Sequence, residues 1–389
     1  MPMISLGIEN LKSFKNEIKG NIGLLCHSAS VASSLTHTID IVLDLYGHRL
    51  KKLFGPQHGL VTDVQDNMVE TEDFFHPHYQ LPVYSLYGEN RAPTKKMLED
   101  LDTLIIDLQD VGTRVYTYIQ TLSYCLQECH KADLSVVILD RPNPVGGEII
   151  EGNILEEKFK SFVGLHEIPQ RHGMTMGEMS LWIKDLLNLN VDLKVIKMSG
   201  WERYMSFRDT GLHWINPSPN LSTPESSYSF VGSVLFEGTN ISEGRGTTRA
   251  LEIVGHPKIE PNSFSEHLNK KLNDPNIYFR PQVFIPTFHK WKDKVCGGVQ
   301  LHCLSPGTAK MWRAGQFLCQ EIYNHLGDEF KWSQKPYEYE FSGLAIDFIN
   351  GSDKIRHWVE QTGSLADLKE IEAVNRDAFL ENRKQFLLY

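Results

Sequence analysis

Carboxylates, carboxamides, arginines and histidines gather directly after several apolar runs of this chain. In chain order these residues are Gln57 and His58, then Asp107, Gln109, Asp110 and Arg114, then Asp140, Arg141 and Asn143. Such side chains are costly to bury without partners. Planar groups of this kind can form paired hydrogen bonds with sugar hydroxyls. The clusters therefore favour a sugar ligand over a nucleotide.

Hydrolysis of a glycosidic bond needs two carboxyl groups that flank the bond, one protonated as an acid and the other ionised. The acids in and near the clusters are Asp63, Glu70, Asp107, Asp110, Asp140, Glu237 and Glu243. Spacing along the chain does not select the pair, because these residues follow different strands.

The densest polar loop is 237–248, which contains two acids, one arginine and three glycines in twelve residues. Glycine lets a backbone approach a ligand closely, so we expect a binding loop, with a plain hairpin as the alternative. Helix capping is the alternative for other residues. Asp110 or Thr113 could cap the helix that follows. Thr175 with Glu178 is typical of a capping box, which predicts a structural role for Glu178.

A sheet must position these clusters, because short apolar runs alternate with helical patterns. The runs that predict strands are 21–26, 50–54, 82–86, 103–106, 135–139 and 194–198. This alternation predicts an α/β fold with a mostly parallel sheet and helices on both faces. Such sheets bind ligands at the carboxyl ends of their strands, where the clusters should converge. The segment 64–81, rich in acids and aromatics, is predicted to be a long functional loop.

The pattern changes in the last third of the chain. Residues 283–288 and 298–304 predict antiparallel strands, and 308–326 predict a long amphipathic helix. At 389 residues the chain is too long for one ordinary core. We therefore predict a first domain over 1–258, which carries the clusters. A smaller α+β domain over 259–389 would supply one wall of the cleft.

The composition and the missing motifs argue against several partners. The net charge of -10 argues against nucleic acid, because phosphate binding needs a basic face. No GxGxxG follows the run 21–26 and no Walker phosphate loop occurs, so we expect no cofactor. The six cysteines form no CxxC pair, so we expect no metal site. We see neither a signal peptide nor an apolar run of about 18 residues, which predicts a cytoplasmic protein without a membrane span.

Several segments, in one order along the chain, resemble a known family. They are FGPQHG (54–59), PVYSLYG (82–88), DLQDVGTR (107–114), LDRPNP (139–144), RHGMT (171–175), PSPN (217–220) and the loop 237–248. Together they resemble the NamZ-type exo-β-N-acetylmuramidases, glycoside hydrolase family 171, formerly catalogued as the domain of unknown function DUF1343. The resemblance implies a Rossmann-like domain and a smaller C-terminal domain with the site between them. It also implies release of N-acetylmuramic acid from the non-reducing end of peptidoglycan fragments during cell-wall turnover and recycling.

One position departs from the family pattern. Many members have Glu where this chain has Gln57, and a carboxamide cannot act as an acid or a base. If that Glu is catalytic in the family, this chain must use another carboxyl group, have a different specificity or be inactive. Glu70 is the first substitute, and Asp110 and Glu243 are the next. With Glu237 and Asp63, these residues complete our catalytic candidates. The loss of the carboxyl also leaves a non-catalytic binder of cell-wall fragments as the alternative, and a cofactor-dependent enzyme as the third.

The substrate in this interpretation is a saccharide that contains muramic acid. The expected substrate-binding residues are Gln57, His58, Asp107, Arg114, Tyr118, Asp140, Arg141, Asn143, His172, Asn220, Asn240 and Arg245. Arginine pairs with carboxylates through two hydrogen bonds. We therefore expect Arg141 or Arg245 to receive the lactyl carboxylate of muramic acid.

Overall fold

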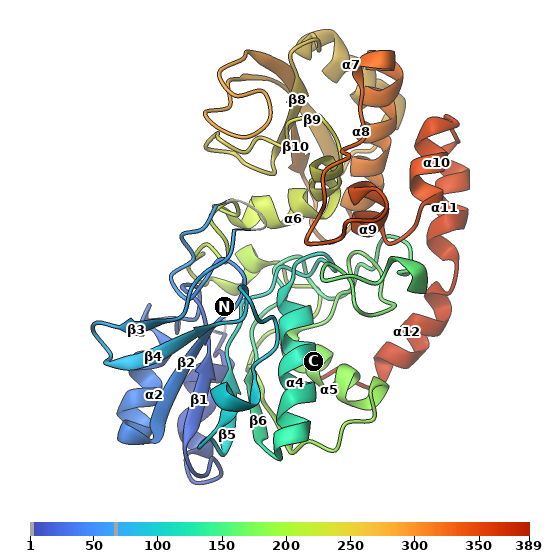
Figure 1. Cartoon of the computed structure of the whole chain (residues 1–389). Helices are drawn as coiled ribbons and strands as arrows, with labels where there is room; N and C mark the ends of the chain where they lie inside the picture. Colours follow the sequence, from blue (N-terminus) through green and yellow to red (C-terminus); the bar gives the residue numbers. More distant parts are fainter. Residues whose placement is uncertain (1–3, 66–68) are drawn as a thin grey trace.

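The computed structural model describes residues 4–65 and 69–389 and shows two bodies, one above the other (Figure 1). The lower body is built on a seven-stranded sheet with the order β3-β4-β2-β1-β5-β6-β7. Its strands are β1 (Ile22–Leu25), β2 (Leu50–Gly55), β3 (Phe74–His76), β4 (Leu81–Ser85), β5 (Thr103–Ile106), β6 (Ser135–Leu139) and β7 (Leu193–Ile196). All neighbouring strands are parallel except β3, which pairs antiparallel with β4.

Two separate cores cover the two faces of the large sheet. Along β5, Leu104 and Ile106 pack into one core and Ile105 packs into the other. The helices of this body are α1 (Gly7–Asn10), α2 (Thr38–Tyr46), α3 (Lys95–Leu98), α4 (Tyr118–Ala132) and α5 (Met176–Leu186). Residues of α3, α4 and α5 line the first core, and residues of α1 and α2 line the second. Since strands of a parallel sheet are apolar on both faces when helices cover both, the short apolar runs are explained.

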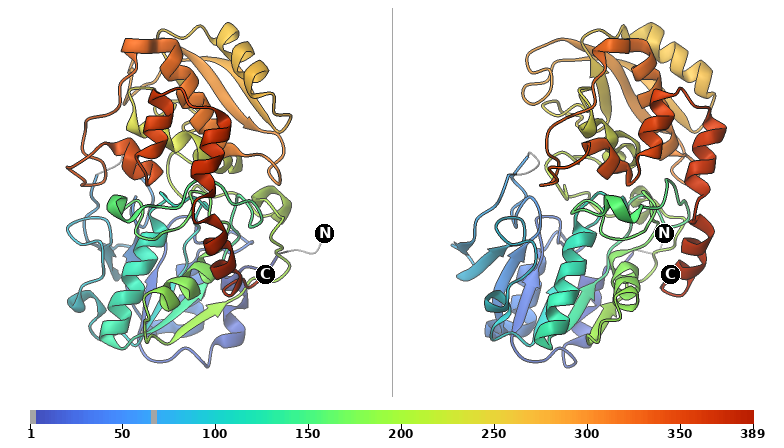
Figure 2. Two further views of the ribbon diagram at one scale, coloured as in Figure 1. Left: turned by 90° about the vertical axis from the view of Figure 1, so that its right-hand side faces the viewer. Right: turned by 45° about the vertical axis from the view of Figure 1, so that its right-hand side comes forward.

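The upper body contains a three-stranded antiparallel sheet with the order β8-β10-β9. Its strands are β8 (Ile253–His256), β9 (Ile277–Phe284) and β10 (Cys296–Cys303), and its helices are α6 (Pro224–Ser233), α7 (Pro261–Leu272), α8 (Met311–Leu326) and α9 (Ala345–Asn350). The chain then descends through α10 (Lys354–Glu360), α11 (Leu365–Ala373) and α12 (Arg376–Lys384). Figures 1 and 2 show this last segment running along one side of the molecule from the upper to the lower body.

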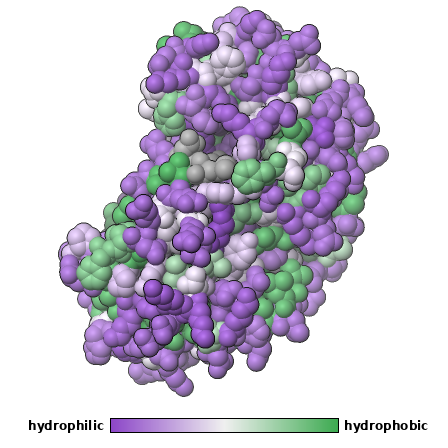
Figure 3. Space-filling model, in the orientation of Figure 1, coloured by the Kyte–Doolittle hydropathy of each residue, from purple (hydrophilic) through white to green (hydrophobic). Residues whose placement is uncertain are grey.

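Short 3-10 helices complete the secondary structure of the described residues. They are Leu11–Phe14, Gly47–Arg49, Glu157–Phe159, Phe207–Thr210, Val234–Gly238 and Gly327–Glu329. Side-chain caps begin two of the α-helices as expected: Thr175 forms a capping box with Glu178 at α5, and Thr94 accepts from the backbone of α3. Figure 3 shows a mostly hydrophilic surface on one face. Among the described helices, none has the length and apolarity needed to cross a bilayer.

The predicted fold class is confirmed, with clear differences in two segments. The runs 103–106 and 135–139 are strands with the predicted bounds. Segment 64–81 is not wholly irregular, because residues 74–76 form β3 as an antiparallel edge strand; residues 66–68 lie outside the described part. The strand predicted over 283–288 ends at Phe284, since Pro286 follows it and cannot donate to a ladder. The domain boundary at 258/259 stays a prediction, and β8 already belongs to the small sheet.

Candidate active site

A pocket lies where the two bodies meet, and we call it the junction pocket. Its polar lining residues are Gln57, His58, Tyr116, Thr117, Ser218, Asn220, Glu237, Arg245, Tyr337 and Glu338. Gln57 and His58 follow β2, and Tyr116 and Thr117 precede α4, so they stand at the carboxyl edge of the large sheet. The predicted convergence at that edge holds for these residues.

Glu237 is one of two carboxylates in the junction pocket, and it is held from two sides. Arg245 Nη2 lies 2.6 Å from Glu237 Oε1. The phenol of Tyr337 donates to Glu237 Oε2 at 2.6 Å. The Glu237 side chain is 7% exposed, so both contacts are shielded from water. Hydrogen bonds to charged groups are worth about 1.5–3 kcal/mol each. The carboxylate is therefore fixed in one orientation.

Glu243 lies behind this pair and fixes Arg245. Its carboxylate is fully buried and contacts Lys290 Nζ at 2.8 Å, Arg245 Nε at 3.2 Å and His289 Nδ1 at 3.3 Å. Burial alone would raise the pKa of Glu243, but Lys290, His289 and Arg245 together hold the pKa well below its usual range. A carboxyl group that stays ionised cannot supply a proton at neutral pH. Its surroundings thus suit an anchor for Arg245 better than an acid.

Glu338 is the second carboxylate of the junction pocket, and our sequence analysis did not select it. Glu338 is 3% exposed. The amide of Gln57 donates to Glu338 Oε1 at 3.2 Å, and the phenol of Tyr87 donates to Oε2 at 2.7 Å. The guanidinium of Arg91 lies 3.7 Å from Oε2. Burial raises the pKa of Glu338, and the Tyr87 hydrogen bond and the Arg91 charge offset this only in part. The alternation of acids and aromatics at 337–340 was the available signal.

Gln57 and His58 present one donor and one acceptor to the site. Thr117 donates its hydroxyl to Gln57 Oε1, which turns the amide N–H groups toward Glu338. His58 Nδ1 lies 2.8 Å from the carbonyl of Val64, so Nδ1 carries the hydrogen. Burial lowers the pKa of His58 to about 4. At neutral pH its Nε2 is therefore an acceptor.

The segment after β2 closes over this part of the pocket. The carbonyl of Gln65 accepts from Asn220 Nδ2 at 2.7 Å and from Arg245 Nη1 at 3.0 Å. Farther along, Tyr339 donates its hydroxyl to Glu70 at 2.8 Å. Asp63 and Glu70 are themselves exposed and are not among the residues that line the junction pocket. Their catalytic roles stay predictions.

Other predicted site residues pair with protein groups outside the lining of the junction pocket. Arg141 forms two hydrogen bonds with Asp107, at 2.5 and 2.8 Å, and Thr38 also donates to Asp107. Asp110 accepts from the backbone of Gly112 at 2.6 Å and lies 3.7 Å from His172 Nε2. These groups form a polar scaffold under the loops, and their roles toward substrate stay predictions.

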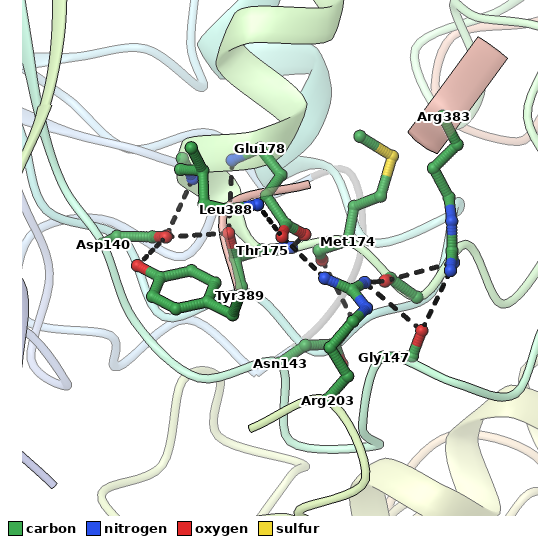
Figure 4. A network of polar contacts seen from close by, with 12 residues as sticks. Asp140, Asn143, Gly147, Met174, Thr175, Glu178, Arg203, Arg383, Leu388 and Tyr389 are labelled. Carbon is green, nitrogen blue, oxygen red and sulfur yellow. Dashed lines mark hydrogen bonds and ion pairs between the residues drawn. The ribbon is translucent and has the colours of Figure 1, made fainter. Parts of the chain in front are cut away.

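Asp140 and Asn143 belong to a network behind the sheet edge (Figure 4). Asp140 accepts from Thr175 Oγ1 and Gly177 N at 2.8 Å each and from the phenol of Tyr389 at 2.7 Å. Burial raises the pKa of Asp140 to about 6, although these three donors lower it. Asn143 donates to the carbonyl of Met174 at 3.0 Å. The network ties the loop after β6 to the beginning of α5.

The last three predicted residues also bind backbone carbonyls. Arg114 donates to four of them, from residues 153, 168, 349 and 350. Tyr118 donates to the carbonyl of Pro217 at 2.8 Å. Asn240 donates to the carbonyl of Glu329 at 2.8 Å. These contacts hold distant segments together around the pocket, which places the three residues in its framework.

Known proteins match this chain from end to end. A family model described as exo-β-N-acetylmuramidase NamZ, N-terminal, matches residues 22–225, and its C-terminal counterpart matches 228–389. The peptidoglycan β-N-acetylmuramidase NamZ of Bacillus subtilis (strain 168) is 38% identical over 390 residues, which cover 100% of this chain and 92% of that protein.

Solved structures of two DUF1343 family proteins from Bacteroides fragilis share the fold. One has a TM-score of 0.88 and 31% identity and covers 100% of both chains. The other has a TM-score of 0.75 and 28% identity and covers 99% of both chains.

Fold and site together define a class: an α/β protein of two bodies, with a pocket at their junction that is lined by two carboxylates. Within that class, the two family models span nearly the whole chain and meet at residues 225–228. The chain belongs to the exo-β-N-acetylmuramidase NamZ family, as the resemblance of its motifs implied.

Proposed function

We propose that the protein is a glycosidase that releases N-acetylmuramic acid from the non-reducing end of peptidoglycan fragments. The observation that carries this proposal is the pair of buried carboxylates, Glu237 and Glu338, in one pocket at the junction of the two bodies. Membership of the family and the activity in the name of the Bacillus subtilis relative support it.

The different surroundings of the two carboxyl groups support a division of labour. Glu237 faces the guanidinium of Arg245, whereas Glu338 faces the amide of Gln57 and the phenol of Tyr87. Glycosidases use such pairs, with one carboxyl group as acid and the other as base or nucleophile. The alternative of a non-catalytic binder rested on the missing carboxyl at position 57. Glu338 weakens that argument, because it places a carboxyl against the same side chain.

The first test is turnover of a chromogenic N-acetylmuramide and of the natural disaccharide with muramic acid at its non-reducing end. We expect release of free N-acetylmuramic acid, identified by mass spectrometry. Glu237→Gln should lose activity by a factor of roughly 10³ or more, since one of two essential carboxyls is gone. Glu266→Gln, in α7 away from the pocket lining, is the matched control. Tight glycan binding with no release by the unaltered protein would establish the binder instead.

A further inference from the structure

We propose that Glu338 is the general acid of this reaction and that Gln57 is the residue that positions it. The inference rests on the proposed function and adds an assignment of roles within the same pocket. A general acid must face the leaving oxygen and carry a proton near the working pH. The fixed orientation and the buried surroundings of Glu338 meet this description. The backbone turn that carries Glu338 brings it to the pocket.

Gln57 and Tyr87 together fix the plane of the Glu338 carboxyl group. Each donates to a different carboxyl oxygen, at 3.2 Å and 2.7 Å. Thr117 donates to the oxygen of the Gln57 amide, and the amide nitrogen is directed toward Glu338. A carboxyl oxygen that accepts one such bond keeps a second lone-pair site. That site can carry the proton for transfer into the pocket that Glu338 lines.

The surroundings of Glu338 favour its protonated form. Burial raises the pKa of Glu338, and the nearby charge of Glu237 raises it further, against the opposing effects of Tyr87, Arg91 and Gln57. Glu243, by contrast, stays ionised among three basic side chains. Surroundings that raise the pKa of one carboxyl group and lower that of another are the usual basis for assigning the acid.

The backbone places the same residue at the tip of a tight turn. Glu338 has a φ of 48° and Tyr339 a φ of 69°, both in the left-handed region. They form a two-residue hairpin turn that is closed by backbone hydrogen bonds between Tyr337 and Glu340. The turn directs the chain so that Tyr337 reaches Glu237 while Glu338 reaches Gln57. Tyr337 thus binds one acid of the pair, Glu237, and the next residue in the chain, Glu338, is the other acid.

The step balances as an ordinary glycoside hydrolysis. The bond between the anomeric carbon and the leaving oxygen breaks, and its electron pair goes to that oxygen. The oxygen takes the proton of Glu338, which is left as a carboxylate. Water supplies the new oxygen on the anomeric carbon, either directly, with one water proton taken by Glu237, or after Glu237 has attacked, with that proton taken by the Glu338 carboxylate. Either route gives two hydroxyl groups from one glycosidic bond and one water.

The leaving group decides whether an acid is needed, and this gives the main test. Glu338→Gln should lose roughly 10²- to 10⁴-fold in kcat on the natural disaccharide. It should keep most activity on a 2,4-dinitrophenyl N-acetylmuramide, whose phenolate leaves without a proton. Glu237→Gln should lose activity on both substrates. Glu340 is a nearby glutamate outside the pocket lining, and Glu340→Gln should keep its activity on both. Equal losses of Glu338→Gln on both substrates would overturn the assignment.

A charge swap tests the part played by Gln57. In Gln57→Glu two carboxyl groups face each other and share one proton, so the alkaline limb of kcat/KM should move to higher pH. The double variant Gln57→Glu with Glu338→Gln moves the carboxyl across the same hydrogen bond and should recover activity lost by Glu338→Gln alone. If the alkaline limb of Gln57→Glu does not move and the double variant is inactive, Gln57 does not position Glu338. Failure of the unaltered protein on every muramide would instead refute the proposed function.

Discussion

The acids in and beside the junction pocket differ in the basic groups that surround them. Glu243 binds three basic groups and orients Arg245, which in turn reaches Glu237. Glu338 meets one arginine at 3.7 Å and otherwise neutral donors. The carboxyl groups of Glu243 and Glu338 therefore ionise differently, because neighbouring charges and burial set the free energy of ionisation.

Arg245 is the arginine that we expect to receive the lactyl carboxylate, because it lines the junction pocket and Arg141 does not. Arg245→Ala should lower kcat/KM on muramides more than on plain N-acetylglucosaminides. Loss of a charged hydrogen bond of about 1.5–3 kcal/mol corresponds to a difference of roughly 10- to 100-fold between the two substrates. The exposed Arg249→Ala on the same loop is the control and should leave both rates unchanged. Equal losses on the two substrates would contradict the assignment.

At the scale of elements, polar networks join the loops that build the pocket. Glu178 caps α5 and also binds Arg203 at 2.6 Å and the backbone of Leu388 at 2.9 Å. Arg383 of α12 donates to the carbonyls of His172, Gly173 and Gly147 (Figure 4). The end of the chain thus secures the beginning of α5 against the loop after β6.

Tyr389→Phe tests this connection, because it removes the phenol that donates to Asp140 at 2.7 Å. The raised pKa of about 6 means that the folded protein binds a proton between the ordinary Asp pKa and 6 that the unfolded chain does not bind. Stability from this group therefore falls as pH rises through that window. The phenol lowers the pKa and limits the fall. Its removal should cost about 1–2 kcal/mol in the free energy of unfolding, with a larger cost above pH 6 than below it.

Urea unfolding at about pH 5 and about pH 8, on either side of this pKa, measures the effect of Tyr389→Phe. Tyr204→Phe is a suitable control because Tyr204 is 56% exposed. A cost that is the same at both pH values would show that Asp140 is not the group involved.

At the scale of the whole molecule, buried polar groups connect the two bodies. Arg114 follows the large sheet and is 1% exposed, yet its guanidinium donates to carbonyls of Ile349 and Asn350 at the end of α9. Glu151 pairs with Arg171 at 3.0 Å and accepts from the backbone of Trp312 in α8. A pocket assembled from two bodies needs such contacts, because small shifts at the junction would separate its walls.

Arg114→Met should lower the free energy of unfolding by about 3–5 kcal/mol, since several buried carbonyls lose their donor at once. Thermal and urea unfolding measure this loss. The control is Arg208→Met, whose side chain is 68% exposed and whose replacement should change stability by less than about 1 kcal/mol. A loss for Arg114→Met as small as for this control would show that water can replace the guanidinium.

The sequence by itself determined most strands of the large sheet, the capping box of α5 and the family. Strands β5 and β6 and the capping box at Thr175 follow from patterns within a few residues, because alternation and capping are local. The motif at 54–59 predicted a site at the edge of the sheet, and Gln57 and His58 do line the junction pocket, as do Asn220, Glu237 and Arg245 from other motifs; the residues of the motif at 107–114 are not among its lining.

Only the tertiary structure decided which acids share the pocket. Gln57 meets Glu338 across 281 positions of sequence, and Tyr337 meets Glu237 across 100. No local pattern encodes such contacts, since they depend on how the second body packs against the first. Asp107 and Asp140 look as suitable in sequence as Glu237, yet they bind Arg141 and Tyr389 inside the framework. Burial and charged neighbours arise only after folding, and they determine which carboxyl group can hold a proton.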